Sequence, residues 1–255
     1  MPKSKITEIE YIYGKHAVYE ALAYKPEIVT TVYLDLNFSD ANLLQKLEAV
    51  KLPIKPLNPK NPPRGISSNA PHQGVVATIK VEKLMIEYKQ FRQSLEATPE
   101  AALLILGEVQ DPHNVGAVIR SAAAFGLKGV LIPPHNQAPV TGTVIKVSAG
   151  MAFRIPLVSI SNVNAVARDL KERGFWLYGL DGTGTVATTT EKFDRPSAFI
   201  LGNEGSGLRQ KTREVCDSII SIPIHPRCES LNAAAATAVV LASWSAQHQA
   251  ALKAV

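Results

Sequence analysis

The sequence has few of the residues on which disulfide-rich and zinc-binding proteins depend. Among its 255 residues there are two cysteines, Cys216 and Cys228, and six histidines, with neither a CxxC pair nor histidines at metal-ligand spacing. A disulfide framework and a metal site are therefore not supported. With so little cysteine, a reducing cytoplasm is the location to expect.

Long apolar runs and clusters of a single charge are missing as well. The N-terminus lacks the apolar core of a signal peptide, and the one long uncharged stretch, residues 230–252, is broken by polar side chains. That stretch predicts a packed helix and no membrane span. The formal net charge of +5 is spread along the chain without a basic tail, so it allows an anionic partner such as nucleic acid without requiring one.

The first part of the chain predicts a small α/β domain over residues 1–81. A short helix near the start is followed by a strand over 28–36, where the Val-Thr-Thr-Val-Tyr-Leu content favours extended backbone. Leu43, Leu44 and Leu47 recur at helical spacing within 40–50, and residues 74–79 have the composition of another strand.

Two connecting segments are expected after these elements. Six prolines between Pro53 and Pro71 exclude a helix or a central strand, and we expect a mobile loop that is either an RNA-contacting arm or a solvated connection. Apolar residues at helical spacing then predict an amphipathic linker helix within 82–100. These residues are Leu84, Tyr88, Phe91 and Leu95.

The remaining residues, 101–255, alternate between strand and helix. Strands are expected at 102–107, 129–132, 175–180, 198–201 and 218–222, and helices at 114–125, 163–173, 208–216 and from 232 to about 252. Because strand, helix and strand follow one another, the sheet is expected to be parallel and the fold class α/β.

Three segments that follow such strands carry chemically informative residues. In the first, Asn114 is suited to cap a helix, and Arg120 lies in the same two turns, where it can hold a phosphate or form only a surface ion pair. The second, residues 201–207, is rich in glycine and presents Glu204. This carboxylate either binds a hydroxyl or a cation, or is a solvated acid in a turn. In the third, Ser230 and Asn232 either cap the last helix or contact a substrate. All three belong at the sheet edge where α/β proteins bind ligands.

Together these segments resemble the three signature motifs of the SpoU (TrmH) family of RNA 2'-O-ribose methyltransferases. The motifs are Asn114-x-Gly116-x-x-x-Arg120-x-Ala122-x-Ala124-Phe125-Gly126, Leu201-Gly202-Asn203-Glu204-Gly205-x-Gly207-Leu208, and Ile222-Pro223-Ile224 with Ser230-Leu231-Asn232. Near the N-terminus, Ile12-Tyr13-Gly14-x-His16-Ala17-Val18 and His72-Gln73-Gly74-Val75 resemble the small substrate-binding domain, similar in fold to a ribosomal protein, of the branch that methylates guanosine in 23S rRNA.

This resemblance implies an α/β fold with a parallel sheet and a C-terminal trefoil knot, with S-adenosyl-L-methionine held in the knot. It also implies a homodimer with active sites at the interface, and Gly202, Ile222 and Leu231 lining the cofactor pocket. The implied ribose-facing residues are Asn114, Arg120, Glu204, Ser230 and Asn232.

The implied reaction is 2'-O-methylation of a ribose in rRNA. Because a guanidinium stays protonated at neutral pH, we assign Arg120 to holding the phosphate and ribose rather than to removing a proton. Ser230 and Asn232 are assigned to orienting the hydroxyl or the cofactor, and Glu204 to organising the network.

The sequence departs from the family at two places and leaves three rival activities open. Pro226 stands where many relatives have glycine, and Ala233-Ala234 follow Asn232 where the usual continuation is Val-Ser, so the family's hydroxyl is missing at 234 and any role of that position is in question. The rivals are 2'-O-methylation of tRNA, protective methylation of rRNA that confers antibiotic resistance, and RNA binding without catalysis.

Overall fold

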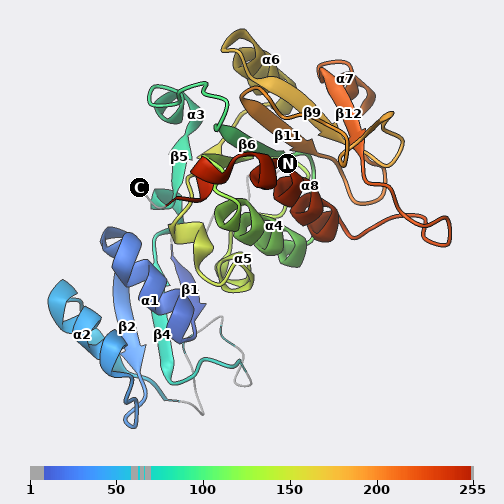
Figure 1. Ribbon diagram of the computed structural model, residues 1–255. Helices are drawn as coiled ribbons and strands as arrows, with labels where there is room; N and C mark the ends of the chain where they lie inside the picture. The colour runs from blue at the N-terminus through green and yellow to red at the C-terminus, as the bar shows by residue number, and fades with distance from the viewer. Residues whose placement is uncertain (1–8, 59–62, 64–65, 67–69, 254–255) are drawn as a thin grey trace. The chain divides into compact units, whose positions relative to one another are not determined.

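The computed structural model describes residues 9–58, 63, 66 and 70–253 (Figure 1). Contacts within the chain divide it into two compact units. The first comprises Met1–Met85 and Val140–Arg154, and the second comprises Ile86–Pro139 and Ile155–Val255. Each unit contains one β-sheet. The edge strand β5 belongs to the sheet of the second unit, although its first residue, Met85, is the last residue of the first unit.

The first unit is built on a four-stranded sheet with the order β1-β4-β2-β3. The strands are β1 (Glu10–Tyr13), β2 (Val29–Leu34), β3 (Ile54–Pro56) and β4 (Val75–Ile79). β4 runs antiparallel to both of its neighbours and is buried at every residue, whereas β3 lies parallel to β2 at the edge. The proline-rich segment thus contains an edge strand, where proline is tolerated, and most of its remainder lies outside the described residues.

Two helices complete the part of this sheet domain that precedes β5. α1 (Lys15–Tyr24) contacts β1 and β4, a short 3-10 turn η1 (Pro26–Ile28) follows it, and α2 (Ala41–Val50) packs on α1. Asp40 caps α2 by accepting a hydrogen bond from the Leu43 amide at 3.1 Å. The expected helix over 40–50 and the strands over 28–36 and 74–79 are confirmed.

A segment distant in sequence also belongs to the first unit. α5 (Gly142–Val147) packs on β1, and the 3-10 turn η3 (Met151–Phe153) packs on α1. Arg154 forms a two-bond ion pair with Glu20, with Nε–Oε2 2.6 Å and Nη2–Oε1 2.8 Å. The Lys146 ammonium lies 4.1 Å from the centroid of the Tyr13 ring. The expected assignment of all residues after 101 to one domain therefore does not describe these contacts, because α5 and η3 bury their apolar side chains against the N-terminal elements.

The second unit contains the larger sheet, in the order β10-β12-β9-β11-β6-β7-β8-β5. Neighbouring strands from β10 to β8 run parallel. The strands are β5 (Met85–Glu87), β6 (Ala102–Leu106), β7 (Gly129–Ile132), β8 (Leu157–Ser159), β9 (Trp176–Leu180), β10 (Val186–Ala187), β11 (Ser197–Leu201) and β12 (Ser218–Ser221). The predicted α/β class with a parallel sheet is confirmed.

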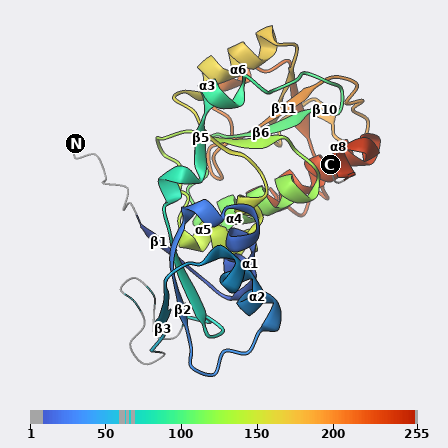
Figure 2. The same ribbon diagram turned by 90° about the vertical axis from the view of Figure 1, so that its left-hand side faces the viewer.

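Helices cover both faces of this sheet. α3 (Tyr88–Phe91) and α6 (Val163–Glu172) lie on one face, and α4 (Pro112–Ala124) and α8 (Ala233–Gln247) lie on the other (Figure 2). The α6 side contributes Val166, Ala167 and Leu170 to the core, against Leu103 and Ile105 of β6. α7 (Gln210–Arg213) and the 3-10 turn η4 (Gln249–Leu252) complete the unit. β6 and β11 are buried at every residue, as is typical of strands covered on both faces.

Two expected helices are wrong. Residues 82–100 do not form a linker helix, but the 3-10 turn η2 (Val81–Lys83), strand β5 and the single turn α3. Their apolar residues recur at helical spacing only because three short elements each place one or two side chains in the core. The helix expected over 208–216 is reduced to α7, because the chain must turn at Cys216 to enter β12.

Cys216 and Cys228 are both free thiols. In the part of the chain that the structure describes, no three or more His, Cys, Asp or Glu residues are grouped to hold a metal ion. No helix among those same residues combines the length and the apolar content needed to cross a membrane.

Asp169 on α6 is shared by three side chains of the second unit. Tyr88 donates to its Oδ2 at 2.5 Å, Arg92 Nη1 to its Oδ1 at 2.8 Å and Arg173 Nε to its Oδ2 at 2.9 Å. Burial opposes ionisation of this carboxyl, but the hydrogen bonds from Tyr88 and Arg173 outweigh burial and lower its pKa. This network ties α3 to α6 across the face of the sheet.

We expect Asp169→Asn to lower the free energy of unfolding by about 1–2 kcal/mol at pH 7, because a charged acceptor is lost from a partly solvent-screened network. The pKa of Asp169 is lower in the folded than in the unfolded state, so its contribution is present above the unfolded pKa of about 4 and is lost as the pH falls below it. Urea unfolding of the wild type and the variant at pH 7 and pH 3 measures this.

Asp194→Asn is the matched control, since the Asp194 side chain is 75% exposed and its loss is expected to change stability by less than about 0.5 kcal/mol. A stability difference for Asp169→Asn that is the same at both pH values would contradict the ionic origin of the effect.

Candidate active site

The three signature segments all begin at one edge of the larger sheet. β6, β11, β9 and β12 are successive parallel neighbours, so the segments after them start at their shared carboxyl edge. The chain enters α4 after β6 and α8 after β12, and these two helices pack against one another (Figure 1). The loop that follows β11 carries the glycines and Glu204.

A chain of hydrogen bonds joins one residue from each segment. Asn232 Nδ2 donates to Asn114 Oδ1 at 2.9 Å, and Asn114 Nδ2 donates to Glu204 Oε1 at 2.8 Å. Asn232 Oδ1 accepts from the amides of Ala234 and Ala235 at 2.9 and 3.2 Å and so caps α8. The cap fixes which end of the Asn232 amide faces Asn114. The carboxylate is the terminal acceptor, and we refer to these three residues as the Asn232–Asn114–Glu204 chain.

The glycine loop is a tight reversal that places Glu204 at its tip. Asn203 and Gly207 exchange backbone hydrogen bonds of 3.0 and 2.9 Å, and the Asn203 side-chain oxygen accepts from the amides of Gly205 and Ser206. A Cβ atom at Gly202 would lie 2.5 Å from the Gly207 carbonyl carbon, and Gly207 itself has φ +66°. Glycine is therefore required at both ends of the reversal. Glu204 is exposed.

A carboxylate from the neighbouring strand supports the end of this loop. Asp181, after β9, pairs with Arg213 at 2.7 Å and accepts a 3.5 Å hydrogen bond from the Leu208 amide. Burial opposes ionisation of Asp181, but hydrogen bonds from Thr183 and Arg213 outweigh burial and lower its pKa. The loop is thus anchored to β9 by an ionised side chain.

Arg120 is not part of the hydrogen-bond chain. It is exposed on α4, six residues beyond Asn114 and thus about 9 Å further along the helix axis. Within the described part of the protein it forms no hydrogen bond or ion pair, so the alternative of a surface ion pair is not realised. Its guanidinium is free to contact a molecule outside this chain.

Two expectations about helix caps are corrected by the structure. Asn114 is not the N-cap of α4: Asp111 takes that position and accepts from the His113 amide at 2.8 Å, because Pro112 occupies the first helical position that proline prefers. The cap of α8 is Asn232 and not Ser230, which is exposed two residues earlier.

The expected cofactor residues lie on two segments of the same edge, the loop after β11 and the segment after β12. Gly202 is buried at the start of the glycine loop, Ile222 is half-buried after β12, and Leu231 is 40% exposed. Ile224, in the same segment as Leu231, is 37% exposed. Apolar side chains that remain open beside a backbone without Cβ provide a surface that suits the flat ring and apolar parts of a nucleoside cofactor.

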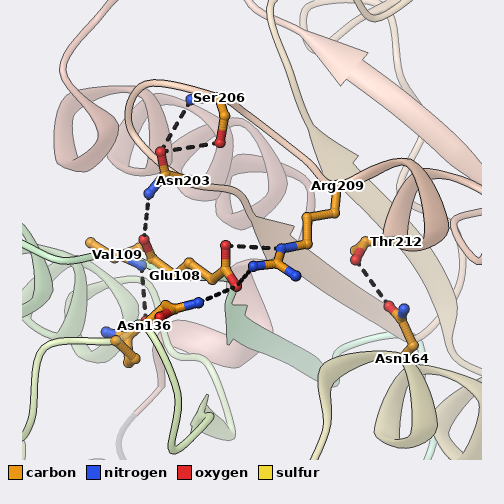
Figure 3. A network of polar contacts seen from close by, with 9 residues as sticks. Glu108, Val109, Asn136, Asn164, Asn203, Ser206, Arg209 and Thr212 are labelled. Atoms are coloured by element: carbon orange, nitrogen blue, oxygen red, sulfur yellow. Dashed lines mark hydrogen bonds and ion pairs between the residues drawn. The ribbon is translucent and has the colours of Figure 1, made fainter.

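Sequence reasoning assigned no role to a polar network beside the glycine loop (Figure 3). Asn203 Nδ2 donates to the Glu108 carbonyl at 3.0 Å, and the Glu108 carboxylate pairs with Arg209 and accepts from Asn136 Nδ2 at 3.3 Å. Glu108 has φ +73°, which is unusual for any residue other than glycine. Its place immediately after a strand was a signal, but nothing in the sequence indicates its backbone conformation.

Comparison with known proteins gives consistent matches over both units. Residues 101–242 match the model of the SpoU rRNA Methylase family, and residues 11–84 match the model described as RNA 2'-O ribose methyltransferase substrate binding. The 23S rRNA (guanosine-2'-O-)-methyltransferase RlmB of Neisseria meningitidis is 34% identical over 242 residues, covering 93% of this chain and 95% of the relative. RlmB of Vibrio vulnificus is 36% identical over 235 residues, covering 91% and 94%.

A solved structure agrees at the level of the fold. The SpoU methyltransferase AviRb from Streptomyces viridochromogenes, crystallised in complex with the cofactor AdoMet, superimposes with a TM-score of 0.79 at 24% identity. The match covers 95% of this chain and 92% of that one.

Proposed function

This chain belongs to the SpoU rRNA methylase family, and we propose that it transfers a methyl group from S-adenosyl-L-methionine to the 2'-oxygen of a guanosine ribose in 23S rRNA. The observation that carries this proposal is the Asn232–Asn114–Glu204 chain, which connects all three signature segments at one sheet edge. The RlmB relatives, named as 23S rRNA guanosine-2'-O-methyltransferases, support the choice of substrate.

Gly202, Ile222 and Leu231 are the residues that would hold the cofactor. The close approach of backbone at Gly202 and the exposed apolar side chains after β12 support this assignment. When bound, the cofactor supplies an electrophilic methyl group on a sulfonium. The residues of this chain then have to align a ribose hydroxyl with that methyl group and provide a path for its proton.

The side chains divide this task by their chemistry. Arg120, unpaired and exposed, holds the phosphate and ribose of the target nucleotide by charge-assisted hydrogen bonds. Asn232 and Ser230 orient the hydroxyl at the start of α8. Glu204 anchors the amide chain through Asn114, so that its carboxylate fixes the direction of both amides. In these roles the Glu204 carboxylate accepts from Asn114, and Asn114 in turn accepts from Asn232, so each side chain fixes the orientation of the next.

Membership of the family also supports a finer architecture. We infer that the segment after β12 forms a trefoil knot in the methyltransferase domain, and that the elements from β1 to β4 form a ribosomal-protein-like RNA-binding domain. The match of residues 11–84 to the substrate-binding model supports the second assignment. A ribosomal substrate is consistent with a cytoplasmic protein.

The protein acts as a homodimer through α4 and α8. α8 is apolar or small on nearly every side, and Val239 remains 41% exposed on it. α4 exposes Ala124 beside Arg120. A second copy would cover these surfaces, because a helix that is apolar on all sides is stable only when it is buried. The dimer places Arg120 at the interface, where the active sites are expected.

The test is methyl transfer from radiolabelled S-adenosylmethionine to purified rRNA and tRNA, assayed separately, followed by mapping of the 2'-O-methyl positions. Label at one guanosine of 23S rRNA is the expected result. Label only in tRNA would overturn the substrate, and absence of label from both, with the cofactor bound, would favour an RNA-binding protein without catalysis. Affinity for RNA is expected to fall as salt rises.

A further inference from the structure

A pocket of about 250 Å³ lies beside the glycine loop in the second unit. Its walls come from the segments that follow β6, β7, β8 and β11, which meet at the carboxyl edge of the sheet. Neither Asn114 nor Asn232 lines it, and neither do Ile222 and Leu231. It is somewhat smaller than the roughly 300–1,000 Å³ of sites for drug-sized ligands, so it has room for a single planar ring system.

The lining of this pocket combines flat surfaces with edge-reading groups. Gly107, Gly202 and Pro133 present backbone or ring surface, whereas Asn136 and Asn164 present carboxamides. Flat apolar surface flanked by hydrogen-bonding groups is what an unstacked nucleobase needs, since proteins read bases by stacking and by hydrogen bonds to their edges. The residues therefore suit a base better than a phosphate.

One carboxylate dominates the polar side of the pocket. Glu108 Oε2 accepts from Arg209 Nε at 3.0 Å, and Glu108 Oε1 lies 2.5 Å from Arg209 Nη2, so a planar fork of two N–H donors faces two carboxylate oxygens (Figure 3). The Glu108 side chain is 22% exposed, whereas that of Arg209 is 66% exposed. The Glu108 carboxylate is thus held in place by its surroundings, whereas the more exposed Arg209 side chain can move away from it.

The backbone around Glu108 is held in a costly conformation. Its φ of +73° is one that residues other than glycine rarely adopt, and such strain concentrates at functional sites. The Asn203 amide holds the Glu108 carbonyl, and the Gln137 side chain accepts from the next amide, that of Val109, at 3.0 Å. The surroundings therefore fix the direction of the carboxylate before any ligand arrives.

We propose that this pocket receives the guanine base of the target nucleotide and that Glu108 reads its Watson–Crick edge, an inference that rests on the proposed function. The N1–H and N2–H donors of guanine form the same parallel pair as a guanidinium, and a carboxylate accepts both at once. Adenine presents an acceptor at N1, which a carboxylate repels. Arg209 occupies the position of the base edge and leaves it for a phosphate when the base enters.

The glycine loop explains how one nucleotide reaches both sites. Gly202 and Gly207 line the pocket, Asn203 holds the Glu108 carbonyl, and Glu204 at the tip of the same loop ends the Asn232–Asn114–Glu204 chain. A ribose oriented by this chain would thus contact the tip of the glycine loop, and a base held by Glu108 would contact its two ends. Glu108 determines specificity, whereas Glu204 serves the reaction.

The experiment measures kcat/KM for methyl transfer to a 23S rRNA fragment that carries the mapped guanosine and to fragments with inosine or adenosine in its place. Inosine lacks the N2 amino group, so the wild type is expected to favour guanosine by about ten-fold, with adenosine poorer still. Glu108→Gln is expected to lower transfer to guanosine at least about ten-fold and to bring the guanosine-to-inosine ratio close to one, since its amide nitrogen repels the N2 amino group.

Two further variants and a binding measurement separate specificity from folding. Glu172→Gln, at an exposed position of α6, is the matched control and is expected to leave rate and ratio unchanged. Arg209→Ala is expected to preserve the ratio within about two-fold, because the carboxylate remains. Calorimetry with S-adenosylmethionine is expected to give the same affinity for Glu108→Gln as for the wild type.

The outcomes distinguish the two proposals. An unchanged guanosine-to-inosine ratio in Glu108→Gln would overturn the base assignment and leave the methyltransferase function standing. A large loss of cofactor affinity in that variant with the ratio unaltered would assign the pocket to the cofactor and overturn the inference. If the wild type methylates no RNA, the proposed function fails and the base assignment fails with it.

Discussion

Arg120→Ala is expected to lower kcat/KM for methyl transfer to rRNA by about 100- to 1,000-fold, while the affinity for S-adenosylmethionine changes less than about two-fold. The reason is the free guanidinium on α4, which has no partner among the residues that the structure describes. A side chain without hydrogen bonds or ion pairs within its own chain contributes little to folding, so its loss is expected to act on the substrate rather than on stability. Radiolabel transfer and cofactor calorimetry on the same preparation measure both quantities.

Two variants sharpen this prediction. Arg168→Ala removes an exposed arginine from α6 and is expected to retain normal turnover, which controls for loss of positive charge. Arg120→Lys keeps the charge but not the planar fork, and we expect it to recover only part of the lost rate. Normal turnover in Arg120→Ala would contradict the assignment of the site as a whole, because Arg120 is the residue assigned to hold the phosphate and ribose.

The elements that could be predicted from the sequence are those whose signal is local and repetitive. β6 and β11 were recognisable because strands buried on both faces are almost continuously apolar. α6 was recognisable because Val166, Ala167 and Leu170 recur on one side of a helix. In these elements the pattern of apolar residues that favours the local conformation is also the pattern that the hydrophobic core requires.

The elements that were missed depend on distant partners. The region 82–100 shows helical spacing, yet strand β5 forms there because the edge of β8 offers hydrogen bonds that the sequence around Ile86 cannot reveal. α5 and η3 belong to the first unit because they pack on β1 and α1, and Arg154 meets Glu20 across 134 positions of sequence. No window of neighbouring residues contains that information.

The candidate site shows the same division. Motif resemblance brought Asn114, Glu204 and Asn232 together, and their hydrogen-bond chain agrees with this grouping. The direction of the chain could not be predicted, because it depends on Asn232 replacing Ser230 as the cap of α8. Glu108 was overlooked because its backbone strain and its pairing with Arg209, 101 residues away, exist only in the folded protein.

The direction of that chain makes Asn232→Asp a decisive variant. An aspartate still accepts from the amides of Ala234 and Ala235, and a carboxylate at a helix N-terminus is favourable, so stability is expected to stay within about 0.5 kcal/mol of the wild type. It cannot donate to Asn114, whose single amide then lies between two carboxylates and can satisfy only one. We therefore expect about a 100-fold loss of kcat, measured by single-turnover methyl transfer.

Asn232→Ala and a double variant complete the argument. Asn232→Ala loses the cap as well as the donor, so it is expected to cost about 1 kcal/mol of stability in addition to the activity. In Asn232→Asp with Glu204→Gln the hydrogen bonds can run in the reverse direction, from residue 204 through Asn114 to residue 232. If the three side chains act as one unit, this double variant is no slower than Glu204→Gln alone. Rate losses that simply multiply would show that Asn232 and Glu204 act independently, and the hydrogen bonds through Asn114 would then have no part in catalysis.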